Sequence, residues 1–381
     1  MLFRVPDLGD RELEVIEAID DLARKLRMRL HEPRRWSGSL RRMQFARAVQ
    51  GSNSIEGFDA AVDDAAAIEL GEEPLDASEE TRLAIKGYCD AMTYVLQMST
   101  EPNFHYGEQL LKSLHFMMTG YDLKNRPGLW RLGAIYVRKE ETGEVVYEGA
   151  DIDDVPLLTH ELVHSLNVDS DCPALVMTGM AHLNLVMIHP FRDGNGRMAR
   201  CLQTLVLARQ GILSPVFCSI EEYLGRNTQL YFDVLAEVGR GSWQPEGDAT
   251  PWVRFTLTAH LRQARTLQRR IKESERLWDE LEKLVDRLGL PDRTMNPLYE
   301  AAMRFRVRNG TYRATLADTD DAITEQVASR DLRLLTSVNL LKANGAARGR
   351  YYVATKELAD LRSKIVAERD ARDDTDPFEG A

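Results

Sequence analysis

One apolar segment, residues 173–188, limits what this chain can fold into more than any other feature. It reads PALVMTGMAHLNLVMI and contains no Asp, Glu, Lys or Arg. A helix that is apolar on all sides has to be surrounded by other elements, so the segment predicts the central helix of a domain. Asp171, with Pro173 near the first turn, is its expected N-cap. The segment ends at His189-Pro190, and a second helical pattern follows over residues 196–210.

The rest of the chain is predominantly helical in pattern. Apolar residues recur at the three- and four-residue spacing of amphipathic helices over residues 11–30, 38–49, 78–98, 107–119 and 256–284. Residues 131–137 and 144–147 are instead β-branched and aromatic, with Glu141-Thr142-Gly143 between them. We therefore expect a mainly α protein with a small β-hairpin in this region.

Composition narrows the class of protein. The 381 residues carry 49 Lys plus Arg against 60 Asp plus Glu, a formal net charge of −11, which argues against non-specific coating of nucleic acid. We find no run of about 18 apolar residues and no signal-peptide core, so we expect no membrane association and a cytoplasmic location. The four cysteines lie far apart in the sequence, as reduced thiols do: Cys89, Cys172, Cys201 and Cys218.

The loop between the two central helices has the sequence HPFRDGNGRMAR, residues 189–200. Gly194 and Gly196 free the backbone to turn its N–H groups inward where a helix begins, which is an anion-binding arrangement. Arg197 and Arg200 project from one face of the first turn and can bind phosphate oxygens. Asp193 beside them is a hard oxygen ligand of the kind that Mg²⁺ takes next to phosphates.

His189 adds a group that exchanges a proton near neutral pH. Pro190 is expected to hold it in an extended conformation at the helix end, and Phe191 to anchor the loop in the core. The string therefore predicts a general base, a metal ligand and a phosphate site within residues 189–200.

At every specified position this string resembles the signature of the Fic family, H-x-F-x-[DE]-G-N-G-R-x-x-R. Residues 219–237, with Tyr223, Asn227 and Tyr231, and the step from Trp252 to Phe255 also look like that family. The resemblance covers roughly residues 35–265. It implies an all-helical core with a small hairpin, and a protein adenylyltransferase that transfers AMP from ATP to a hydroxyl side chain of a target protein.

Carried over position by position, the resemblance implies a role for each residue of the string. His189 would act as general base on the Ser, Thr or Tyr hydroxyl of the target, and Asp193 would hold Mg²⁺. The phosphates and adenine of ATP would be bound by Gly194, Asn195, Gly196 and Arg197 (α and β), Arg200 (γ) and Tyr231 (adenine).

The hairpin arm Glu144-Val145-Val146-Tyr147 matches the family's flap, which registers the target segment by main-chain pairing. The Pro-Pro that often follows this flap is replaced here by Glu148-Gly149-Ala150.

Ser52-x-x-x-Glu56-Gly57 resembles the family's inhibitory motif, [ST]-x-x-x-E-[GN], and precedes the core. A Glu56 carboxylate paired with Arg200 would remove the partner of the γ-phosphate and leave ATP in an unproductive pose. The same spacing occurs in variants of the capping box, which is the purely structural alternative.

Other reactions at the same site stay open. Doc-type relatives phosphorylate their targets and have Lys in place of the second Gly, whereas Gly196 here favours adenylylation. The site could also run the reverse hydrolysis of AMP from modified targets, and the chain itself could be a target.

The string His160-Glu161-Leu162-Val163-His164 has the H-E-x-x-H pattern of zinc proteases. Histidines at i and i+4 share a helix face, and Glu161 could serve as a base. A third ligand is missing at the recognised spacings, since Asn167 stands where one extended version has Gly. We therefore favour surface histidines on an amphipathic helix.

The C-terminal part predicts a separate unit in which helices at residues 297–308 and 321–341 and a hairpin at 342–355 resemble a winged helix. Its arginines could contact DNA phosphates, so a DNA-binding regulator is the non-enzyme alternative: Arg330, Arg333, Arg348 and Arg350. Acidic residues crowd the same unit, and winged helices also dock proteins: Asp318, Asp320, Asp321 and Glu325.

We expect five consecutive regions: an N-terminal helical region with the inhibitory motif (1–102), a Fic core (103–265), a helical connector (266–292), a winged-helix-like domain (293–360) and a polar tail (361–381). The expected ligands and partners are ATP, Mg²⁺ and a target protein, with DNA and a second copy of the chain in a homodimer as alternatives.

Overall fold

The computed structural model describes residues 1–31, 34–139, 142–211, 217, 219–317, 322–346 and 349–379, apart from the side chain of His31. It divides into two compact units. The first comprises Met1–Met28, Phe45–Arg265 and Thr375–Ala381, and the second comprises Arg29–Gln44 and Thr266–Asp374.

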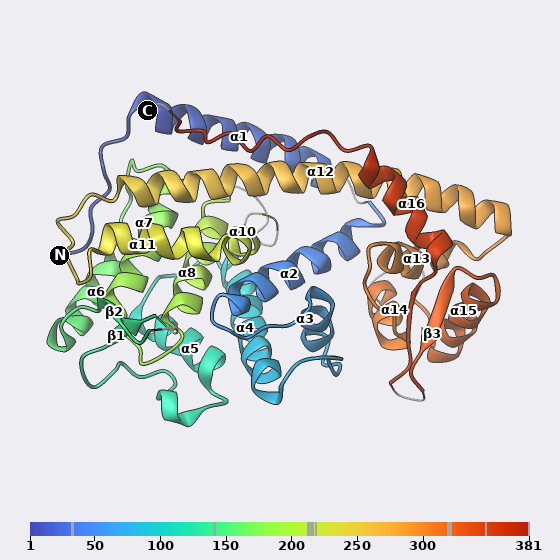
Figure 1. Cartoon of the computed structure of the whole chain (residues 1–381), viewed down its shortest axis with the longest axis horizontal. Coiled ribbons are helices and arrows are strands. Elements are labelled where there is room, and N and C mark those ends of the chain that lie inside the picture. Colours follow the sequence, from blue (N-terminus) through green and yellow to red (C-terminus); the bar gives the residue numbers. More distant parts are fainter. Residues whose placement is uncertain are drawn as a thin grey trace. The chain divides into compact units, whose positions relative to one another are not determined.

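Helices make up most of the described chain, which confirms the mainly α prediction (Figure 1). In chain order they are α1 Asp10–His31, α2 Ser37–Ser54, α3 Val62–Glu69, α4 Glu79–Met98, α5 Glu108–Thr119, α6 Val155–Ser165, α7 Ala174–Ile188, α8 Asn195–Arg209, α10 Glu221–Arg226, α11 Thr228–Gly239, α12 Thr250–Leu288, α13 Met295–Ala302, α14 Asn309–Leu316, α15 Glu325–Ser337 and α16 Lys356–Ala367. Short 3-10 helices cover Leu123–Asn125, Ile152–Asp154 and Asp292–Thr294.

The apolar helix α7 is central to the first unit, as its sequence predicts, and packs along α8 (Figure 1). Neighbouring core residues bond to it: the indole of Trp252 donates to the carbonyl of Gly179 at 2.7 Å. The expected N-cap at Asp171 is wrong. Pro173 occupies that position without a side-chain cap, because its own fixed φ of −54° already starts the helix.

The predicted hairpin is confirmed and consists of β1, Tyr136–Arg138, and β2, Val145–Glu148. The two strands are antiparallel, with Val137 opposite Tyr147 and an irregularity after Val137. The N–H of Glu148 also donates to the carbonyl of Gly241 at 2.9 Å, which ties the end of β2 to the turn after α11.

Helix α2 extends beyond the pattern that predicted its end at residue 49, because Gly51 has a packing role there. A Cβ on Gly51 would lie 2.6 Å from the carbonyl oxygen of Glu221, and one on Gly225 would lie 2.6 Å from the Cα of Gly51. The two glycines let the backbones of α2 and α10 approach closely, so a residue type that usually weakens a helix here permits a helix contact.

In the second unit, α13 is followed by a bridge between Val307 and Tyr352, then by α14, α15 and the antiparallel strands β3, Leu341–Asn344, and β4, Tyr351–Ala354. Helix α14 was not predicted, and α13 ends earlier than expected, because Arg304 adopts a left-handed φ of 70°. The buried carboxylate of Asp331 joins the helices by accepting from Arg293 at 2.7 and 2.9 Å and from Tyr312 at 3.0 Å.

The predicted polar tail differs from the structure at both ends. Its first residues belong to α16, and Phe378 is buried in the first unit beneath the guanidinium of Arg254. Several predicted positions lie outside the described residues: Glu141, Cys218, Asp318, Asp320, Asp321 and Arg348.

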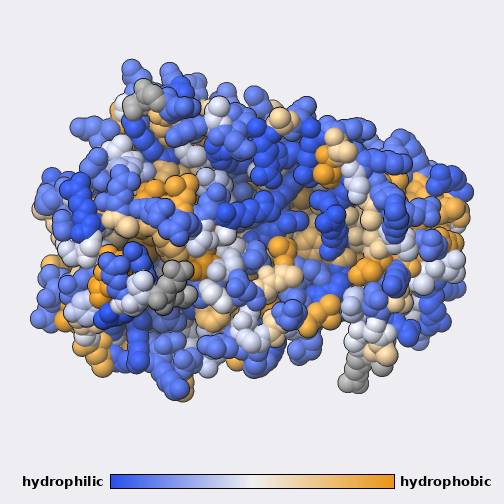
Figure 2. Space-filling model, viewed as in Figure 1, coloured by the Kyte–Doolittle hydropathy of each residue, from blue (hydrophilic) through white to orange (hydrophobic). Residues whose placement is uncertain are grey.

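Hydrophilic side chains predominate on the face shown in Figure 2, with hydrophobic residues in scattered patches. None of the helices in the described ranges is long and apolar enough to cross a membrane. Cys89, Cys172 and Cys201 are free thiols.

Candidate active site

His189 closes the C-terminal end of α7. Its N–H donates to the carbonyl of Leu185 at 3.1 Å, and its backbone is left-handed, with φ 54° and ψ 57°. The expected extended conformation is therefore wrong, because the residue serves as the helix C-cap. Its Nδ1 lies 3.0 Å from the carbonyl oxygen of Val186. Since a carbonyl can only accept, Nδ1 carries the proton and Nε2 presents its lone pair.

Burial lowers the pKa of His189, against the opposing effects of its hydrogen bond to Val186 and the Glu56 charge. The imidazole is therefore neutral at pH 7, and its orientation is set by the helix end. A neutral ring with an acceptor at Nε2 is what a general base requires.

The loop after His189 is held by Asn195 and Phe191. The amide of Asn195 accepts from the N–H of Phe191 at 2.9 Å and donates to its carbonyl at 2.9 Å. Phe191 is buried and stacks on His115 with ring centroids 3.8 Å apart. The Asn195 side chain, which the sequence assigned to phosphate binding, thus holds the loop, and its backbone lies at the start of α8.

His115 on α5 is a second loop anchor that sequence reasoning missed. Its Nδ1 accepts from the N–H of Gly128 at 2.9 Å, so Nε2 carries the proton and donates to the carbonyl of Asp193 at 3.1 Å. Burial lowers its pKa to about 4, which keeps both bonds intact at neutral pH. Its hydrogen bonds to Gly128 and Asp193 are to backbone atoms, and backbone atoms leave no signal in the sequence.

Arg197, on the first turn of α8, is fully buried. Its guanidinium lies 4.8 Å over the ring of Phe58 and 3.5 Å from an oxygen of Asp193. Within the described part of the chain, its three guanidinium nitrogens have no hydrogen-bond partner. Because a buried cation without hydrogen bonds is costly, this side chain points to an anionic ligand.

Arg200 is buried one turn further along and meets the predicted inhibitory residues. Its Nε donates to Ser52 Oγ at 2.7 Å, and one terminal nitrogen donates to the Ser52 carbonyl at 2.9 Å and to Glu56 Oε1 at 2.7 Å. Burial opposes ionisation of Glu56, but the charges of Arg200 and Arg197 outweigh it and lower the pKa of the carboxyl. The structure thus brings the three residues together: Glu56 and Arg200 form an ion pair, and Ser52 accepts hydrogen bonds from Arg200.

The Glu56 carboxylate also covers Gly196. A Cβ built on Gly196 would overlap Glu56 Oε1 and lie 3.0 Å from a terminal nitrogen of Arg200. The absence of a side chain at this position is therefore what allows the carboxylate to reach the start of α8.

The flap residues divide into two groups. Glu144 and Val145 are exposed and Val146 is half-buried. Tyr147 is buried, and its hydroxyl donates to the carbonyl of Met187 at 2.8 Å. Tyr147, which the sequence assigned to target docking, therefore anchors the flap to the last turn of α7.

Tyr231 differs from its predicted place beside adenine. It is 1% exposed, and its hydroxyl lies 2.9 Å from His182 Nε2, with Trp252 and Phe255 packed around the ring. An aromatic residue in an amphipathic helix fits a core position as well as a binding surface, and here it fills the core.

The H-E-x-x-H string lies on α6. The rings of His160 and His164 are 6.4 Å apart, and His160 Nδ1 lies 3.3 Å from Glu108. Across the described ranges, no cluster of three or more His, Cys, Asp or Glu residues could hold a metal ion.

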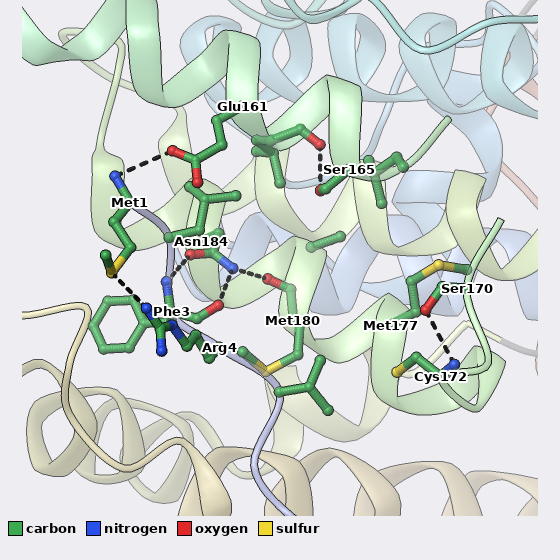
Figure 3. Close-up of a pocket in the computed structure, with 15 residues that line it drawn as sticks. Met1, Phe3, Arg4, Glu161, Ser165, Ser170, Cys172, Met177, Met180 and Asn184 are labelled. Carbon is green, nitrogen blue, oxygen red and sulfur yellow. Dashed lines mark hydrogen bonds and ion pairs between the residues drawn. The ribbon is translucent and has the colours of Figure 1, made fainter. Parts of the chain in front are cut away.

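Glu161 borders a cavity of about 500 Å³ between the N-terminal segment, α6 and α7 (Figure 3). In this cavity the side-chain oxygen of Asn184 is already occupied, because it accepts a hydrogen bond from the backbone N–H of Phe3 at 2.8 Å. This cavity contains none of residues 189–200.

Comparisons with known proteins agree with this site. Residues 106–207 match the model of the Fic/DOC family. The protein adenylyltransferase Fic of Drosophila virilis is 34% identical over 188 residues, 46% of this chain and 35% of that protein, and the one of Aedes aegypti is 41% identical over 76 residues, 20% and 13% of the two chains. The chain thus spans about a third of the length of the Drosophila relatives it matches.

Solved structures extend the likeness to the fold. A Fic family protein from Desulfovibrio desulfuricans G20 superposes with a TM-score of 0.58 at 20% identity, over 92% of this chain and 98% of that one. Fic-1 of Caenorhabditis elegans superposes with a TM-score of 0.53 at 22% identity, over 69% and 73%. The chain therefore matches the Fic/DOC family over residues 106–207 and has the fold of Fic proteins, which confirms the resemblance of its loop string.

Proposed function

We propose that the chain is a protein adenylyltransferase that transfers AMP from ATP to a hydroxyl side chain of a target protein. The observation that carries this proposal is the neutral, oriented imidazole of His189 next to a helix start where Arg197 is buried without hydrogen bonds. Relatives named protein adenylyltransferases support the same chemistry.

In this reaction, Nε2 of His189 removes the proton of the target hydroxyl. The hydroxyl oxygen forms a bond to the α-phosphorus of ATP, the bond between that phosphorus and the bridging oxygen breaks, and pyrophosphate leaves. The N–H groups at the start of α8 and the Arg197 guanidinium bind the α- and β-phosphates, while Arg200 binds the γ-phosphate.

Asp193 has the chemistry of a Mg²⁺ ligand. Its side chain is 43% exposed, accepts from Asn125 at 3.2 Å and lies beside Arg197, so an oxygen faces the phosphate region. A Mg²⁺ ion bound with ATP supplies neutralisation of phosphate charge, and Asp193 is the residue that would hold it.

Glu56 acts as a brake in this proposal. Its carboxylate takes the hydrogen bond of Arg200 that the γ-phosphate needs and covers Gly196, where phosphate oxygens approach. The small residue at 196 also supports AMP transfer over Doc-type phosphorylation, which is associated with Lys at that position.

The exposed flap positions Glu144 and Val145 support docking of an extended target segment. The strand β2 offers main-chain groups for such pairing close to His189. Val146, also predicted to dock the target, is half-buried and would contribute through its main-chain groups.

A second candidate function belongs to the second unit. The order α13, Val307 bridge, α14, α15, β3 and β4 supports the predicted winged-helix-like unit, and Arg330 and Arg333 are exposed on α15. We propose DNA binding by α15 as this candidate. Retention on DNA that falls with salt and is lost in the double Arg330→Ala, Arg333→Ala variant would support it; salt-independent retention would contradict it.

Mass spectrometry of proteins incubated with α-labelled ATP tests the main proposal. The Glu56→Gly variant should label proteins, including itself, with AMP, and His189→Ala in the same background should not. Asp59→Gly, which removes an exposed carboxylate three residues away, is the matched control and should keep the low wild-type level. Transfer of the γ-phosphate with no AMP adduct would exclude adenylylation.

A further inference from the structure

Arg131 is a buried arginine, 5% exposed, between the flap and the end of α7. Its Nε donates to the carbonyl of His189 at 2.9 Å, and one terminal nitrogen donates to the carbonyl of Gly133 at 2.6 Å. The other terminal nitrogen donates to the carbonyl of Ala150. Its described side-chain partners are therefore backbone carbonyls, one on the catalytic helix end and two on the flap.

The first contact fixes an unusual backbone. His189 is left-handed, a conformation that costs free energy for a residue with a Cβ and persists where neighbouring groups hold it. Arg131 binds two consecutive carbonyls there, that of His189 through Nε and that of Pro190 through its own main-chain N–H at 3.0 Å. These bonds hold the ψ of His189 and the path of the chain as it leaves α7, while the Nδ1 bond to Val186 orients the ring.

The other contacts hold both roots of the flap. Gly133 precedes β1 and Ala150 follows β2, so one guanidinium joins the start and the end of the hairpin. The adjacent Gly149 fits tightly beneath the catalytic residue, since a Cβ there would lie 3.1 Å from the Cβ of His189. The flap and the general base are thus fastened to the same side chain.

We propose that Arg131 is a positioning residue that couples the target flap to His189, so that a target segment paired with the flap presents its hydroxyl to Nε2. The inference rests on the proposed adenylyl transfer. The planar fork of Arg directs three donors to three separate carbonyls, which Lys with its single ammonium group does not reproduce.

The test uses the full chain carrying Glu56→Gly, with Arg131→Gln or Arg131→Lys added. We expect kcat for AMP transfer to fall about 10- to 100-fold, because misplacement of a reacting group by about 1 Å has effects of this size. The Kd for ATP should stay unchanged, since Arg131 touches no phosphate-site residue. The ¹⁵N chemical shifts of the His189 ring should show a loss of the single Nδ1–H tautomer.

Arg209→Gln is the matched control, because the Arg209 guanidinium also donates to a backbone carbonyl, that of Glu101 at 2.6 Å, at the far end of α8 from the flap and His189. It should keep the parental kcat.

If Arg131→Gln fails to fold, kcat is measured on Arg131→Lys instead, because Lys keeps the charge and a similar size. A parent without AMP transfer would refute the proposed function itself, whereas an active parent whose kcat is unchanged by Arg131→Lys would overturn the positioning role.

Discussion

The two ends of the loop between α7 and α8 differ in how their polar groups are satisfied. At the His189 end, the imidazole, the loop carbonyls and the Asn195 amide all have partners within the protein. At the phosphate end, Arg197 has no hydrogen bond within the described residues, and Arg200 is paired with Glu56, which a neighbouring segment supplies. In the proposed reaction, the base is therefore positioned before ATP binds, whereas Glu56 occupies the place at Arg200 that the γ-phosphate would take.

Removing the base should have the largest effect and leave the other end intact. In the Glu56→Gly background, His189→Ala should lower kcat by about 10³-fold, the middle of the range for a lost general base. Titration calorimetry should find the same Kd for ATP. A large loss of ATP affinity would show that the two ends are not independent.

Removing the Arg197 cation should do the reverse. Arg197→Met in the Glu56→Gly background should raise the KM for ATP about 10- to 100-fold, as expected for lost charge-assisted hydrogen bonds. The Tm without nucleotide should change little, because loss of the Asp193 ion pair and the Phe58 contact is offset by removal of a buried charge that lacks hydrogen bonds. A clear fall in Tm measured by differential scanning calorimetry would mean that Arg197 is part of the fold rather than a ligand site.

Loosening the brake at its helix contact should have a smaller effect. Gly51→Ala forces α2 away from α10. If this weakens the packing of α2, and with it the Glu56–Arg200 contact, by about 1 kcal/mol, the population of molecules with Glu56 released, and the AMP-transfer rate, should rise roughly fivefold.

The matched control is Gly38→Ala on the same helix, where an added Cβ meets nothing within 4 Å. Adding Gly51→Ala to Glu56→Gly should change the rate little. An equal increase in that background would mean that the contact acts by another route.

The pH profile should show the smallest change. A general base works when neutral, and burial lowers the pKa of His189 from its ordinary value of 6.5, so kcat/KM of the Glu56→Gly variant should stay level down to pH 6.5 and fall at lower pH. The Glu56 charge raises this pKa, so its removal moves the acid limb further down. Steady-state rates between pH 5 and 8 measure this, and a midpoint above 6.5 would contradict a buried neutral base.

The sequence predicted the parts of the site that are local in the chain. His189, Gly194 and Arg197 are close neighbours, and their chemistry can be read from spacing. Arg131 and His115 could not be found in this way, because they bind backbone carbonyls 58 and 78 residues away, and any residue type has such a carbonyl. Gly51 indicated the end of a helix because its packing partner, α10, is distant in sequence.

The bare Cα at Gly196 links two properties that are usually considered separately. Any side chain acquired there would expel Glu56 and at the same time reshape the surface that receives the nucleotide. Under the proposed mechanism, a substitution at Gly196 that altered the transferred group would therefore also release the Glu56 brake. Positions 56 and 196 consequently restrict each other's evolution, and a new specificity at this site requires a new means of restraint.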